Sequence, residues 1–167
     1  MIVSKGEFIG FINSDDIYKK NALSIISNYI RKNKTADFIF GSVKKHWGIL
    51  HGYKPHKIKY SWGFYSSHST GFFIKRKAAE KVGFYNIKYK YHADYDYFYR
   101  LIVKNKMKGI STKKDEVVGT FRRGGFSSKI SFLKKLKEDI KIRYDNGQNI
   151  FLLILIFSNK FLRNLDK

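Results

Sequence analysis

The chain has 167 residues, of which 43% are hydrophobic and 17% aromatic, so it is long enough to bury one core and too apolar to be disordered throughout. Its 34 Lys and Arg against 13 Asp and Glu give a formal net charge of +21, which favours anionic partners such as nucleic acid, acidic lipid or phosphorylated small molecules, although the scattered lysines also fit compositional drift. Cysteine is absent, which excludes disulfide bonds and thiolate metal sites.

The first third of the chain predicts a β-α-β unit. The run Glu7 to Asn13 is short and apolar, which is typical of a strand buried on both faces, and a helix is expected over Asn21 to Lys34. Asp37 to Val43 is a second strand. The apolar residues at helical spacing are Leu23, Ile26 and Ile30. This order is the usual signature of a parallel sheet flanked by helices.

The middle of the chain begins with His46 to Ser67, whose Trp, Tyr, Gly and His residues predict short strands and a mobile loop. A strand over Thr70 to Ile74 and a short helix over Lys75 to Val82 follow, with Gly83 as the C-cap. A longer helix is expected from Ala93 or Asp94 to about Asn105. Its buried side would consist of Phe98, Leu101 and Ile102.

The last third changes character. Glu116 to Phe121 predicts one more strand and Arg122 to Gly125 a turn, and from Ser128 onward the pattern is helical with a break at Asn146-Gly147. One face of the first of these helices carries Leu133, Leu136 and Ile140. We therefore expect two parts, an α/β domain over residues 1–127 and a basic, apolar helical tail over residues 128–167.

The tail contains the longest apolar run, Ile150 to Phe157, which is far below the roughly 18 to 20 residues that span a bilayer. Lysines flanking an apolar stripe favour attachment to an anionic membrane, whereas a helix packed on the core fits the pattern equally well.

The stretch "GEFIGFINSDDIY" ends a buried strand in two adjacent carboxylates, Asp15 and Asp16. Ligands of open α/β sheets bind beyond the carboxyl ends of the strands, and two neighbouring carboxylates favour a bound cation. A Mg²⁺ or Mn²⁺ ion carrying a diphosphate would satisfy this position. The alternative is that these residues only cap the helix that follows.

A second acidic cluster, "ADYDYFYR", places Asp94 at a helix start and Arg100 further along, where it could orient carboxylates or bind phosphate. Here too the alternative is an N-cap and an ordinary charged helix face. Weaker candidates for contacts with a diphosphate, a metal or an acceptor are Arg122, Arg123, His68 and His92.

Three segments together resemble the family 2 glycosyltransferases of the GT-A fold, in the subgroup similar to bacterial cell-surface polysaccharide transferases. They are "KGEFIGFINSDDIYKKNALSIISNYI", "HSTGFFIKRKAAEKVGFYNIKYKYHADYDYFYRLI" and "RRGGFSS". The resemblance implies a GT-A-like (Rossmann-like) α/β fold, with a mixed sheet flanked by helices and a helical C-terminal tail.

The resemblance also implies a reaction, the inverting transfer of a sugar from a nucleotide-diphosphate donor to a hydroxyl of a glycan or lipid-linked acceptor. By this similarity Asp16 would bind Mn²⁺ or Mg²⁺, Asp15 would lie near the metal or the donor sugar, and Asp94 would be the general base. Further substrate-binding candidates are Arg100, His68 and Arg123. Such an enzyme is expected in the cytoplasm, peripherally at the inner face of the membrane.

Two departures from the family keep alternatives open. Family members normally begin with nucleotide-binding strands ahead of the stretch that matches Gly6 to Asp16, so we expect a chain without them: a truncated gene, a misplaced start, or a half-enzyme completed by another chain. The Gln-x-x-Arg-Trp pattern of processive enzymes is also missing. The rival class, a basic and aromatic nucleic-acid-binding module, is disfavoured because the aromatic residues cluster in apolar runs.

Overall fold

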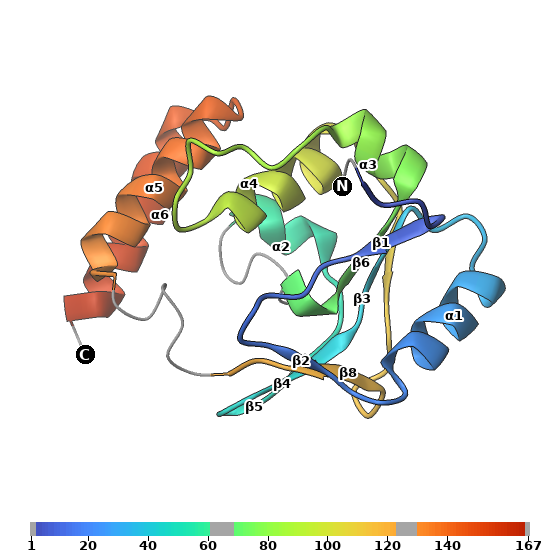
Figure 1. Cartoon of the computed structure of the whole chain (residues 1–167). Helices are drawn as coiled ribbons and strands as arrows, with labels where there is room; N and C mark the ends of the chain where they lie inside the picture. The colour runs from blue at the N-terminus through green and yellow to red at the C-terminus, as the bar shows by residue number, and fades with distance from the viewer. Residues whose placement is uncertain (1–2, 61–68, 123–129, 166–167) are drawn as a thin grey trace.

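The computed structural model describes residues 3–60, 69–122 and 130–165 (Figure 1). The strands are β1 (Phe8–Gly10), β2 (Ile17–Tyr18), β3 (Phe38–Phe40), β4 (Ser42–Lys45), β5 (Gly48–Leu50), β6 (Phe72–Lys75), β7 (Gly109–Ser111) and β8 (Val117–Thr120). The helices are α1 (Ala22–Lys32), α2 (Pro55–Tyr60), α3 (Arg76–Val82), α4 (Ala93–Tyr99), α5 (Phe132–Asp145) and α6 (Ile150–Leu165). A 3-10 turn, η1 (Ser69–Gly71), precedes β6, and a π-helical segment, η2 (Arg100–Lys104), continues α4.

In the described ranges the strands form two four-stranded sheets, ordered β1-β6-β3-β7 and β2-β8-β4-β5. Both are mixed. In the first, β6 runs antiparallel to β1 and β3 while β3 is parallel to β7, and in the second, β8 runs antiparallel to β2 and parallel to β4. The mixed α/β architecture is therefore confirmed. The β-α-β unit gives β1 and β3 the same direction, as expected of a parallel sheet, but the two strands do not pair, because β6 lies antiparallel between them.

The predicted strand over Asp37 to Val43 is in fact two strands that enter different sheets. The chain passes from β3 to β4 at Gly41, where an added Cβ would lie 2.4 Å from Cγ2 of the buried Val118. A side chain at this joint would thus collide with β8. Only a residue without a Cβ fits without displacing that strand.

The alternation of side chains along the central strands sorts the core onto two faces of the sheet. Phe38 and Phe40 of β3 pack in the larger cluster, where the Phe98 ring of α4 stands 5.2 Å from that of Phe40. Ile39 points the other way, into a smaller cluster with Ala22 and Ile26 of α1. These clusters hold many of the aromatic rings, as expected of core residues and not of base-stacking surfaces.

The helices cover both faces of this sheet (Figure 1): α1 lies on one side, and α3 and α4 lie on the other. Gly83 ends α3 with φ +84°, which confirms the predicted C-cap. The predicted helix to Asn105 is also confirmed, with Phe98, Leu101 and Ile102 buried, although its second half is π-helical. The strands β2 and β7 were not predicted, because β2 has only two residues and β7 begins with a glycine, a residue that is depleted in strands.

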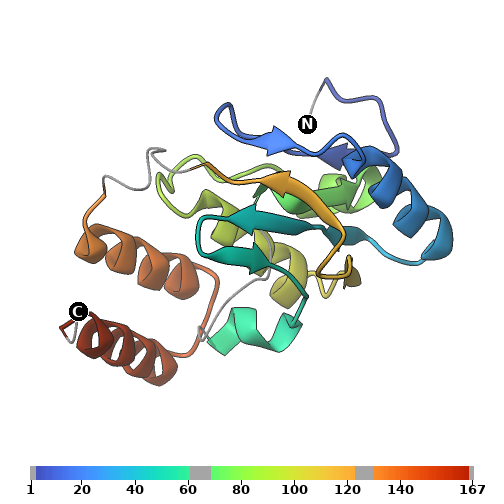
Figure 2. The same cartoon turned by 90° about the horizontal axis from the view of Figure 1, so that it is seen from below.

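The helices α5 and α6 lie side by side at the end of the molecule opposite α1 (Figures 1 and 2). Helix α5 is part of the core, since Ile142 belongs to the larger cluster and Leu136 is buried, whereas Leu133 is 50% exposed. The Glu138 carboxylate accepts hydrogen bonds from the backbone N–H groups of residues 90, 91 and 92 at 2.7 to 3.0 Å. The segment that leads into α4 thus packs against α5. A domain boundary at residue 128 stays a prediction.

Candidate functional site

Asp16 lies at the meeting point of three segments that are far apart in the sequence. Its carboxylate, in a residue that is 7% exposed, accepts hydrogen bonds from the Asn13 side-chain amide at 3.0 Å, from the Thr70 hydroxyl, and from the Arg122 backbone N–H at 3.3 Å. The donors come from the loop after β1, from η1 and from the end of β8. Such a set fixes the orientation of the carboxylate, so Asp16 is more than a helix cap.

Asp94 lies in the first turn of α4, where its Oδ1 accepts a hydrogen bond from the Tyr95 backbone N–H at 2.8 Å. The residue is half-buried, and negative charge at this end of a helix is favoured by the helix dipole. The predicted helix start is confirmed.

Lys45, at the end of β4, connects the two acidic motifs. Burial lowers the pKa of Lys45 below its ordinary 10.5, and the carboxylates of Asp94 and Asp16 both act in the opposite direction. Its ammonium therefore lies within electrostatic range of two carboxylates that are 78 positions apart in the sequence. The same ammonium lies 4.7 Å from the centre of the Phe121 ring, next to the residue whose N–H binds Asp16.

Tyr85 lies on the other side of Asp94. Burial, and after it the Asp94 carboxylate, raise the pKa of Tyr85. Its ring stacks on Tyr97 at 4.4 Å, and its buried hydroxyl has no hydrogen-bond partner within the described ranges. The surroundings of Asp94 thus combine a basic, an aromatic and a hydroxyl group.

Arg100 has internal partners. Its Nε donates to Asp96 Oδ2 at 2.9 Å, and its two terminal nitrogens donate to the backbone carbonyls of Val82 at 2.7 Å and Phe84 at 2.8 Å. Asp96 is 2% exposed and also accepts a hydrogen bond from Asn146. Arg100 therefore orients a carboxylate, one of its two predicted uses, and substrate binding by Arg100 stays a prediction that would require these contacts to break.

The remaining predicted residues are placed as follows. Asp15 is half-buried beside Asp16, and His92 precedes α4 with a buried Nδ1 that has no partner in the part of the chain that the structure describes. His68 and Arg123 lie outside the described residues.

The fold brings three residues to this site that sequence reasoning did not name as candidates: Asn13, Thr70 and Lys45. Asn13 and Thr70 stand inside the quoted segments "FINSDD" and "HSTGFF", so a closer inspection of those segments could have found them. Lys45 carries no such signal, because it is one of 34 Lys and Arg residues without distinctive spacing.

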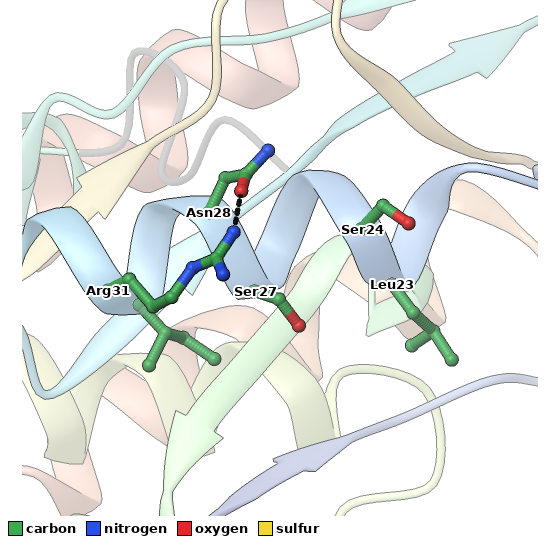
Figure 3. A pocket seen from close by; sticks show the side chains of 6 residues that line it. Leu23, Ser24, Ser27, Asn28 and Arg31 are labelled. Carbon is green, nitrogen blue, oxygen red and sulfur yellow. Dashed lines mark hydrogen bonds between the residues drawn. The ribbon is translucent and has the colours of Figure 1, made fainter.

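A separate pocket on the outer face of α1 does not contribute to this site (Figure 3). It is lined by Leu23, Ser24, Ser27, Asn28, Ile30 and Arg31. Arg31 donates a hydrogen bond to Asn28 across it, and the lining contains no carboxylate. Leu23, expected among the apolar residues of this helix, is 66% exposed here.

The donor chemistry of the site fits a hard divalent cation. Asp15 and Asp16 offer carboxylate oxygens, which Mg²⁺ and Mn²⁺ prefer over nitrogen or sulfur. Among the described residues no three His, Cys, Asp or Glu side chains gather as a metal cluster. The protein would therefore supply one or two carboxylates, and phosphate oxygens and water would complete the coordination, as is usual for Mg²⁺ with a nucleotide.

The chain has a glycosyltransferase-like fold. It is similar to a solved structure of the glycosyltransferase TarS from S. aureus, residues 1–349, with a TM-score of 0.58 at 14% sequence identity. The match covers 96% of this chain and 47% of that one, so the chain spans about half the length of the TarS structure. No protein-family model and no curated protein matches the chain. At this identity the likeness shows the fold alone.

Proposed function

We propose that the site around Asp16, Lys45 and Asp94 transfers a sugar from a nucleoside-diphosphate donor to an acceptor hydroxyl, with inversion at the anomeric carbon. The observation that carries the proposal is the position of Lys45, whose ammonium lies within electrostatic range of both Asp16 and Asp94. Two acidic motifs that the resemblance assigns to donor and acceptor would thereby share one site. The glycosyltransferase-like fold supports the same reaction class.

The donor half of the site is centred on Asp16. Asp16, with Asp15, would hold Mg²⁺ or Mn²⁺, which neutralises the charge of the departing diphosphate. The hydrogen bonds from Asn13, Thr70 and the Arg122 N–H keep the Asp16 carboxylate in one orientation before any ligand arrives, which lowers the entropy cost of binding. Lys45 contributes a fixed positive charge close to that carboxylate.

The acceptor half is centred on Asp94. As the acceptor oxygen attacks the anomeric carbon it must lose its proton, and a carboxylate within hydrogen-bond reach accepts that proton. Asp94 projects from the first turn of α4, a helix packed against the sheet through Phe98, so its backbone is firmly positioned.

The first test is a thermal-unfolding comparison with and without Mn²⁺, over a panel of nucleoside diphosphates. A ligand that binds only the native state at a hundredfold excess over its Kd raises the stability by roughly 2.7 kcal/mol. We expect one nucleotide to raise the melting temperature only with the metal present. Asp16→Asn should abolish the shift, and Glu80→Gln, an exposed carboxylate on α3, is the matched control.

The second test measures release of nucleoside diphosphate from sugar donors. Asp94→Asn should keep the nucleotide-dependent shift and lose turnover by about a hundredfold or more. A shift without turnover in the wild-type chain would support the half-enzyme alternative. The absence of a metal-dependent shift for any nucleotide would contradict a donor site in this chain.

A further inference from the structure

The outward face of α6 is apolar along its whole length. Six of its residues are between 52% and 73% exposed: Ile150, Phe151, Ile154, Leu155, Leu162 and Leu165. At 100° per residue all six fall on one side of the helix, where Ser158 is the sole polar residue among them. The rings of Phe157 and Phe161 stack 5.9 Å apart at the edge of this stripe. Single exposed apolar residues are common, but a continuous stripe marks an interaction surface.

The opposite side of α6 is already occupied. Leu153 and Ile156 are buried where α6 packs on α5, and Lys160 on the same side pairs with the buried Asp139 of α5 at 2.5 Å. The helix is therefore held lengthwise against α5, at the outer edge of the molecule (Figure 2). The exposed surface of α6 is the side that faces away from α5, so a partner would contact the helix along its length.

The net charge of the chain indicates which kind of partner this surface of α6 would bind. A second copy of the chain would bring another net charge of +21 to the interface, which opposes association. An anionic surface is instead attracted by this net charge, to which the exposed Lys134, Lys137 and Lys141 of α5 and Arg163 of α6 contribute. An apolar helical face on a strongly basic chain fits a helix that lies in the interface of an acidic bilayer.

We propose that α6 docks this chain onto an anionic lipid bilayer, with its outward apolar face inserted among the headgroups and its axis parallel to the surface. The Phe, Leu and Ile side chains enter the acyl boundary, and the net positive charge of the chain attracts the acidic headgroups. The proposal goes beyond sugar transfer, because it needs neither donor nor acceptor.

The test is flotation with vesicles of equal parts phosphatidylglycerol and phosphatidylcholine. Deletion of the tail is unsuitable, because Glu138 of α5 binds the segment before α4 and Asn146, the residue that follows α5, binds Asp96. The variant is therefore the triple substitution Phe151→Gln, Ile154→Gln and Leu155→Gln, which keeps the charge and the helix propensity. Its matched control is Leu23→Gln, Phe84→Gln and Ile87→Gln, three exposed apolar residues far from α6 in sequence.

We expect the α6 variant to bind these vesicles about a hundredfold more weakly than the wild type, while the control triple binds as the wild type does. Binding should also decrease on pure phosphatidylcholine. Equal binding of both triples, or no binding by the wild-type chain, would overturn the proposal. So would a concentration-dependent dimer in light scattering that the α6 variant abolishes, since the face would then belong to a second copy.

A second measurement does not depend on the folding of a triple variant. Because the chain has no cysteine, Leu155→Cys and Leu23→Cys each create a unique attachment point for an environment-sensitive dye. On the acidic vesicles the dye at position 155 should shift to the blue and become protected from aqueous quenchers, and the dye at position 23 should not. The same response at both positions would contradict docking through α6.

Discussion

Removal of the Asp96 side chain should destabilise the protein far more than removal of Asp94, two residues away. Asp96 is 2% exposed, and its oxygens accept hydrogen bonds from Arg100 Nε and Asn146 Nδ2, both at 2.9 Å. Asp96→Ala leaves the guanidinium and the amide without this partner. Loss of one member of a buried ion pair costs about 3 to 5 kcal/mol.

The expected cost lies at the low end of that range. The Arg100 side chain is 20% exposed and keeps its bonds to the carbonyls of Val82 and Phe84, and Asn146 keeps its bond to the Ile142 carbonyl at 2.9 Å. We therefore expect about 3 kcal/mol. With a urea dependence of about 2 kcal/mol per molar, the unfolding midpoint should fall by about 1.5 M.

The assay is urea unfolding followed by circular dichroism, with Asp94→Ala as the control. Asp94 is half-buried in the first turn of the same helix, so its loss should cost at most about 1 kcal/mol. If the two variants unfold within 0.5 M of each other, Asp96 is not the internal anchor inferred here.

Three further predictions concern other parts of the fold. Gly41→Ala should destabilise the protein by about 1 to 3 kcal/mol in urea unfolding, because the new Cβ would lie 2.4 Å from Val118. The double variant with Val118→Ala should recover part of that loss, and the absence of any recovery would contradict the steric cause. Thr70→Val removes a hydrogen bond to Asp16 at nearly constant volume, so it should reduce the metal-dependent nucleotide shift more than Ser69→Ala does. Hydrogen bonds from Lys88 and then Tyr89 lower the pKa of Asp145, so its stabilising contribution is present above the ordinary value of 3.8 and is lost as the pH falls below it. The difference in unfolding free energy between the wild type and Asp145→Asn should accordingly stay constant above about pH 5 and shrink toward pH 3, and a difference that grows in acid would refute this reasoning.

The helices other than α2 could be predicted because each is a local feature with its own signals, whereas α2 (Pro55–Tyr60) lies in the segment expected to form short strands and a loop. The segments that became α3 and α4 contain an apolar period and, for α3, a glycine with positive φ at the end. The strand pairing could not be predicted, because the position of β6 between β1 and β3 depends on contacts between residues more than 30 positions apart in sequence. A period of two does not reveal which neighbour a strand will choose.

The candidate site was only partly predictable for a similar reason. Asp16 and Asp94 stand in compact motifs, so their residue types and positions were informative. Within "ADYDYFYR" the sequence does not show which carboxylate faces the interior, and the structure separates Asp96, which binds Arg100 and Asn146, from Asp94, which interacts with Lys45. That assignment depends on the placement of α5 and β4, which are distant in the sequence.

The contacts between α4 and α5 also impose an order in time on a chain that is synthesised from its N-terminus. Asp96 must wait for Asn146, which is 50 residues further along, and ribosomes add about 5 to 20 residues per second. For roughly 2 to 10 seconds, therefore, the Asp96 carboxylate of the nascent α4 lacks the Asn146 amide with which it is later buried. The segment that carries Asp94 should therefore mature late, after α1 and the central strands have associated.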